Sequence, residues 1–192
     1  PLHWEEDVRR MHGIASARAK ELGVPLSLVA YSFSALVFQV LAAEFPFGKR
    51  ILFAPAFETY FWYPIVVWIS GLIPNYAFHT LIPEGYYANQ RGGLRSMLAL
   101  NHFLKRWRAG EGRQDKAPTL VWADFEDELV NAKKLSDFAS TKSTWTFEST
   151  NVKGSQLKRS YHHLIIDQAA VGPQEWSRMM DGSIKFLESG SK

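Results

Sequence analysis

The sequence predicts an α/β domain with a mostly parallel sheet and flanking helices. Three short runs, 25–31, 49–57 and 117–125, are apolar through their centres, as expected for strands that are buried on both faces. The fourth strand candidate, 143–150, alternates in character and suits a position nearer the sheet edge. Helical patterns separate these runs, and this alternation of strands and helices is typical of a layered α/β domain.

Residues 91–116 read as a basic amphipathic helix and then a polar loop, and four other segments have the periodicity of helices. In residues 3–22, apolar side chains recur every three or four positions, and Gly23 and Pro25 then end the helix. Residues 34–45 follow the first strand candidate directly. Residues 127–140 separate the third and fourth strand candidates, and 173–189 form the last helix, with Pro173 near its first turn.

Residues 58–116 interrupt the alternation, because they are too many for a simple crossover. We therefore predict a core of residues 1–57 and 117–192 with an insertion at 58–116. The insertion begins with an uncharged apolar run, 59–74, which contains Pro64. A membrane span needs about 20 apolar residues, so the run favours a segment packed over the domain or a surface that meets lipid-like ligands. A membrane anchor is the alternative.

The composition excludes several kinds of chemistry. The 192 residues contain no cysteine, which rules out disulfides, zinc-thiolate sites and thiol nucleophiles within them. The net charge is only +3, and no basic stripe interleaved with aromatic residues indicates nucleic-acid binding. No cofactor is implied.

Ser32 lies between the first strand candidate and the helix that follows it, in the sequence AYSFSA. A nucleophile on a sharp strand-to-helix turn needs small residues two positions away on either side. Ala30 and Ser34 occupy these positions, although neither is glycine. The alternative is a turn serine that caps the following helix.

Acidic and histidine side chains follow two later strand candidates. An acidic cluster ends the third, where open α/β sheets place functional groups, and contains Asp124, Glu126, Asp127 and Glu128. The fourth is followed by SYHHLIID, with His162 and His163. A solvated loop, or a metal site shared by the two loops, is an alternative, but the spacing matches no zinc pattern. A serine, a carboxylate and a histidine at strand ends are the groups that nucleophilic catalysis requires.

These motifs resemble those of the α/β-hydrolase superfamily, in particular its esterases, lipases and thioesterases. LSLVAYSFSALVFQVLA is similar to the nucleophile strand, elbow and helix, and APTLVWADFEDELV to the strand and loop that carry the acid. The resemblance implies a Ser32, Asp127 and His162 triad. His162 is favoured over His163 because it stands five residues before Asp167.

The same resemblance implies an activity and a binding site. We expect cleavage of a carboxylic ester or thioester with an apolar acyl group, through an acyl-enzyme on Ser32. The backbone N–H of Phe33 would bind the oxyanion, and residues 58–116 would form the lid. Aromatic side chains are expected to line the substrate pocket, namely Tyr31, Phe57, Phe61 and Trp62. The alternative function is a non-catalytic binding protein with this fold, which the missing elbow glycines favour.

Family members have about four strands before the nucleophile strand, whereas only one helix precedes it here. The chain therefore resembles the C-terminal two-thirds of the fold. We expect a separate or cleaved N-terminal segment to complete the sheet. Without such a segment, an apolar sheet edge would be exposed.

Overall fold

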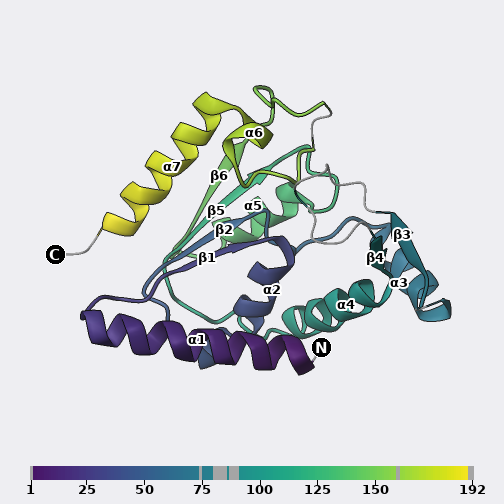
Figure 1. The fold of residues 1–192 in the computed structure, drawn as a ribbon, viewed down its shortest axis with the longest axis horizontal. Coiled ribbons are helices and arrows are strands. Elements are labelled where there is room, and N and C mark those ends of the chain that lie inside the picture. The colour runs from purple at the N-terminus through teal and green to yellow at the C-terminus, as the bar shows by residue number, and fades with distance from the viewer. Residues whose placement is uncertain (1, 74, 80–85, 87–90, 159–160, 190–192) are drawn as a thin grey trace.

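A four-stranded parallel sheet forms the centre of the computed structural model, which describes residues 2–73, 75–79, 86, 91–158 and 161–189 (Figure 1). The strand order is β1-β2-β5-β6 and every pairing is parallel. These strands are β1 (Leu28–Tyr31), β2 (Arg50–Phe53), β5 (Thr119–Asp124) and β6 (Trp145–Thr150). The predicted class, a mostly parallel sheet with flanking helices, is confirmed.

The helices cover both faces of the sheet. In Figure 1, α7 lies on one side of the sheet, and α1, α2 and α4 lie on the other. The bounds are α1 (Leu2–Leu22), α2 (Ser32–Val40), α3 (Tyr63–Leu72), α4 (Arg95–Arg108), α5 (Ala132–Ser140), α6 (Gln168–Val171) and α7 (Pro173–Glu188). A 3-10 turn, η1 (Ala42–Glu44), follows α2, and two short antiparallel strands, β3 (Ala77–His79) and β4 (Arg91–Gly93), form a separate pair.

Alternation along the strands creates two hydrophobic cores. Leu52 and Val121 point toward α2, α4 and α5, whereas Ile51 and Trp122 belong to the core on the α7 side. Since successive side chains of a strand point to opposite faces, a strand between two helix layers is covered on both faces and is mainly apolar. This arrangement explains why β2 and β5 are buried along their whole length.

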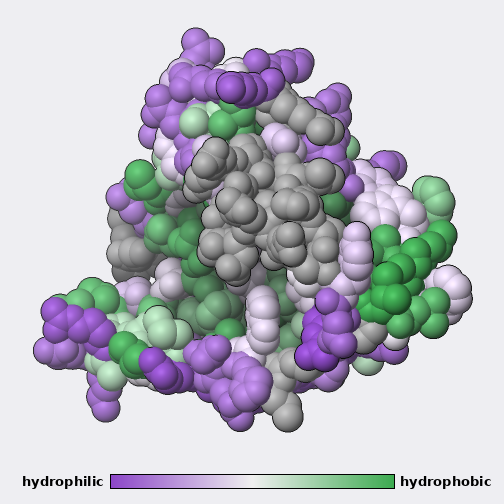
Figure 2. All heavy atoms as spheres, turned by 45° about the vertical axis from the view of Figure 1, so that its right-hand side comes forward, coloured by the Kyte–Doolittle hydropathy of each residue, from purple (hydrophilic) through white to green (hydrophobic). Residues whose placement is uncertain are grey.

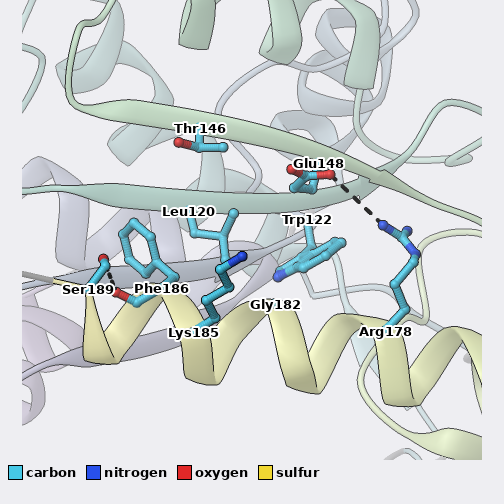
Figure 3. A pocket seen from close by; sticks show the side chains of 9 residues that line it. All are labelled: Leu120, Trp122, Thr146, Glu148, Arg178, Gly182, Lys185, Phe186 and Ser189. Carbon is cyan, nitrogen blue, oxygen red and sulfur yellow. Dashed lines mark hydrogen bonds and ion pairs between the residues drawn. The ribbon is translucent and has the colours of Figure 1, made fainter.

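Helix α7 lies close to the sheet at Gly182. A Cβ atom there would lie 3.0 Å from the ring of Trp122, so glycine permits the close approach. One residue further on, Ser183 Oγ accepts a hydrogen bond from Trp122 Nε1 at 3.1 Å. A groove of about 420 Å³ runs along this contact, between α7 and strands β5 and β6 (Figure 3). It lies on the face of the sheet opposite to α2.

The predicted insertion, 58–116, contains two unlike parts. Helix α4 packs on α2 and contributes Phe103, Leu104 and Trp107 to the larger core. Helix α3 instead exposes apolar side chains. Figure 2 shows a continuous hydrophobic area at the right of the molecule, the side on which α3 lies in Figure 1. The exposed apolar residues of this α3 surface are Phe61, Ile65, Trp68, Ile69, Leu72, Ile73 and Tyr76.

Candidate active site

The turn between β1 and α2 holds Ser32 in a strained conformation. Its φ angle is +50°, in the left-handed region that is uncommon for residues other than glycine. The hydroxyl of Ser34 braces the turn, because it donates to the Tyr31 carbonyl at 2.7 Å and accepts from the Tyr31 N–H at 3.2 Å. The strand-to-helix turn predicted from the sequence is therefore present without its usual glycines.

Ser32, His163 and Asp127 form a continuous series of contacts. Ser32 Oγ lies 2.7 Å from His163 Nε2, and His163 Nδ1 lies 2.8 Å from Asp127 Oδ2. The Asp127 side chain is fully buried, and the His163 side chain is 12% exposed. An ionised carboxylate can only accept hydrogen bonds. The proton of a neutral imidazole is therefore expected on Nδ1, which leaves Nε2 free to accept from Ser32.

The Asp127 carboxylate is held in place by its own loop. Its Oδ1 atom accepts the backbone N–H groups of Leu129 at 2.7 Å and Val130 at 2.8 Å. The Asp127 carbonyl accepts the hydroxyl of Tyr60 at 2.7 Å. These bonds fix the carboxylate in the orientation from which Oδ2 reaches His163.

The sequence-based choice between the two histidines requires correction. His162 does not face Ser32; its Nδ1 lies 2.9 Å from Asp124 Oδ2 and its Nε2 lies 3.4 Å from Glu126. Adjacent residues of the loop therefore point to different carboxylates. Asp167, which set the predicted register, instead caps α6 by accepting the N–H of Ala170 at 2.9 Å.

The carboxylates around His162 raise the pKa of its ring. Burial lowers the pKa of His162, but the hydrogen bond with Asp124 and the charges of Asp124, Glu128 and Glu126 outweigh burial and raise it above the usual value. Asp124 is buried, with 5% of its side chain exposed. His162 and Asp124 thus form a second acid–histidine pair beside the first.

Tyr31, which the sequence suggested as a pocket residue, lies beside His163. Its hydroxyl donates to the His163 carbonyl at 3.1 Å, and the two ring centroids are 5.3 Å apart. Burial raises the pKa of Tyr31, and the charges of Asp127 and Glu128 raise it further. The phenol therefore stays protonated and can donate this bond.

The other predicted pocket residues have different surroundings. Phe57 is fully buried and stacks on Trp107, with centroids 4.7 Å apart; it is a core residue and does not line an open surface here, which corrects the expectation. Phe61 is 88% exposed. Trp62 is half-buried and stacks with Tyr60.

Phe33, the predicted oxyanion donor, is in the first turn of α2, directly after Ser32. The first N–H groups of a helix have no acceptor within the helix, and they carry the positive end of its dipole. The Phe33 ring packs between Trp4, at 4.6 Å, and Phe103, at 5.8 Å. Its backbone is therefore anchored by aromatic contacts from α1 and α4.

A metal cluster and a membrane-spanning helix are both absent from the described residues. These residues contain no group of three or more histidine, aspartate or glutamate side chains that could hold a metal ion. None of their helices is long and apolar enough to span a membrane.

No family model matches the chain, and no curated protein matches it. Solved structures do. A monoglyceride lipase from Saccharomyces cerevisiae has a TM-score of 0.67 at 11% identity, with 96% of this chain and 67% of that chain covered. A monoacylglycerol lipase from Paleococcus ferrophilus has a TM-score of 0.63 at 13% identity, with 94% and 74% covered.

A third similar structure is of a protein that is not described as a lipase. It is a putative non-heme bromoperoxidase from Mycobacterium tuberculosis, with a TM-score of 0.55 at 16% identity and with 93% of this chain and 73% of that chain covered. At such identities the similarity concerns the fold, and one fold can carry several activities.

Proposed function

Since the chain has the α/β-hydrolase fold, we propose that it is a serine hydrolase acting on a carboxylic ester or thioester with an apolar acyl group. One observation carries the proposal: Ser32, on a strained turn, contacts His163, which contacts buried Asp127. A serine hydroxyl is a weak nucleophile unless a base takes its proton and a third group orients the base. The two monoglyceride lipases among the similar structures support the substrate class.

The proposed reaction proceeds in two halves. Ser32 Oγ attacks the carbonyl carbon while His163 Nε2 takes its proton, and Asp127 stabilises the imidazolium without being protonated. The oxyanion accepts a hydrogen bond from the Phe33 N–H; such a donor is worth about 3 kcal/mol in the transition state. His163 then protonates the leaving alcohol or thiol. Water, deprotonated by His163, finally attacks the acyl carbon, and His163 returns the proton to Ser32 Oγ as the carboxylic acid is released.

Hydrolysis of aryl esters of increasing acyl length tests the proposal. We expect turnover by the wild type and its loss in Ser32→Ala, which removes the attacking oxygen. The corresponding thioesters distinguish the two leaving groups. A wild type that binds these esters without cleaving them would instead indicate a non-catalytic binding protein.

We also propose that residues 58–116 contain a lid, formed by the part around α3 and not by the buried helix α4, and that the α3 surface makes transient contact with lipid. The run 59–74 has no charged residue, and Phe61, Trp68 and Leu72 are each more than 60% exposed. Contiguous exposed apolar areas mark sites of interaction with proteins or membranes. Aromatic side chains favour the boundary between water and lipid.

Vesicle binding tests the lipid contact. We expect the double variant Ile65→Ser and Trp68→Ser to reduce partitioning onto phosphatidylcholine vesicles by at least about 10-fold, because burial of a large apolar side chain is worth about 1.5–3 kcal/mol. Ile184→Ser is the control, since this residue is 53% exposed on α7, outside the α3 surface. Equal binding by all three proteins would refute the contact.

Finally, we propose that an extended segment, separate from these residues or cleaved from their N-terminal side, pairs with β1. Among the described residues β1 pairs only with β2, and Val29 is 61% exposed. A mainly apolar groove of about 270 Å³ lies beside it, lined in part by Ile166 and Trp176. Protection of the Val29 amide from hydrogen exchange in the purified protein, with a co-purifying segment, would support this pairing. An exposed amide would oppose it.

A further inference from the structure

The loop that carries His163 lies outside the strands and helices. Residues 161–166 lie between β6 and α6, and one backbone bond within the loop joins the Leu164 N–H to the Tyr161 carbonyl at 3.1 Å. The position of the His163 ring therefore depends on what holds this loop against the loop after β5.

Glu128 contacts the backbone of this loop at two consecutive residues. Its Oε1 atom accepts the N–H of His162 at 3.0 Å, and its Oε2 atom accepts the N–H of His163 at 2.9 Å. One carboxylate thus bridges two consecutive amides. Hydrogen bonds to an ionised acceptor are stronger than those between neutral groups.

We propose that Glu128 is a positioning residue for His163, an inference that rests on the proposed function. Glu128 is adjacent to Asp127, so a single loop supplies two kinds of contact to the histidine. Asp127 binds the ring at Nδ1, and Glu128 binds the backbone. The Tyr31 hydroxyl also donates to the His163 carbonyl. The backbone of His163 is therefore held at both its N–H and its carbonyl, and the ring is held at Nδ1.

Glu128 acts through His163 and not on the substrate. Its carboxylate oxygens accept hydrogen bonds from main-chain nitrogens. Because Glu128 is exposed, its charge is solvated, and removing the carboxylate leaves no buried charge without a partner. Removing the Glu128 carboxylate should leave the side chains of Ser32, His163 and Asp127 intact but allow the loop 161–166 to change its position. A displacement of about 1 Å at a catalytic group can cost on the order of 100-fold in rate.

Glu126 offers a matched control in the same loop. It is also exposed and acidic, and its contact is with the His162 ring at 3.4 Å instead of the backbone. Glu126→Gln therefore removes an equal charge from the same loop without removing an acceptor of the His162 or His163 N–H.

The test combines ester kinetics with amide hydrogen exchange on the full chain. For Glu128→Ala we expect kcat to fall by about 10- to 100-fold with little change in KM, and the amides of His162 and His163 to exchange faster. Glu128→Gln, which keeps the size of the side chain, should give a smaller effect of the same kind. Glu126→Gln should match the wild type in both measurements.

The possible failures are distinguishable. Unchanged exchange in both Glu128 variants would show that the bridging contact does not hold the loop. Faster exchange with unchanged kcat would show that it does not position His163. Both results overturn the inference and leave the proposed function standing, whereas a wild type without ester turnover overturns the proposed function.

Discussion

His163→Ala is expected to lower kcat for ester hydrolysis by at least about 10³-fold. The substitution removes the base whose Nε2 lies 2.7 Å from Ser32 Oγ, and loss of the base from such a triad costs nearly as much as loss of the nucleophile. Steady-state kinetics on an aryl ester measure the effect. Thermal unfolding should show that the variant is folded.

The neighbouring histidine provides the control. In His162→Ala the backbone N–H that binds Glu128 is retained, and the lost ring contacts Asp124 and Glu126 instead of Ser32. We expect kcat to fall by less than about 10-fold, since no reacting group is removed. If His162→Ala lost more activity than His163→Ala, the base would have to be reassigned.

Asp127→Asn is expected to lower kcat by about 10²- to 10⁴-fold. A carboxamide can donate to His163 Nδ1 and so favour the tautomer with the proton on Nε2, which cannot accept the proton of Ser32. The remaining side-chain oxygen can still accept the N–H groups of Leu129 and Val130, as Oδ1 does now, so the fold should persist. Kinetics at saturating ester measure the loss.

Asp124→Asn is the matched control, because both aspartates are buried, Asp124 at the end of β5 and Asp127 in the loop that follows it, and each contacts a histidine ring. We expect its activity to stay within about 10-fold of the wild type, since the group it orients is His162 and not the base. Equal losses in the two variants would contradict the assignment of Asp127.

The fold could be predicted from the sequence because its signals are local. Continuous apolar runs indicated three strands of the sheet, an alternating run indicated the fourth, and the helical patterns between them indicated a mostly parallel sheet. The turn at Ser32 could be placed because a strand and a helix flank it directly. The core position of α4 was not predicted, since its burial depends on Phe103 and Trp107 meeting side chains far away in the sequence.

The candidate site could be predicted only in part. The chain order of serine, acid and histidine was visible in the sequence, but the choice between His162 and His163 was not. Two adjacent histidines meet two carboxylates three residues apart, and only the path of the loops determines which pair faces Ser32. The bridging contact of Glu128 with two amides has no local sequence signal, because an exposed glutamate in an acidic loop ordinarily indicates only solvation.

A fluorophosphonate probe tests the central claim most directly, because it forms a stable adduct only with a serine that a neighbouring base has activated. Mass spectrometry of the labelled full chain should locate one adduct, on Ser32. The adduct should be absent in Ser32→Ala, form far more slowly in His163→Ala and form normally in His162→Ala. A folded wild type that remains unlabelled, or an adduct on another residue, would contradict the account.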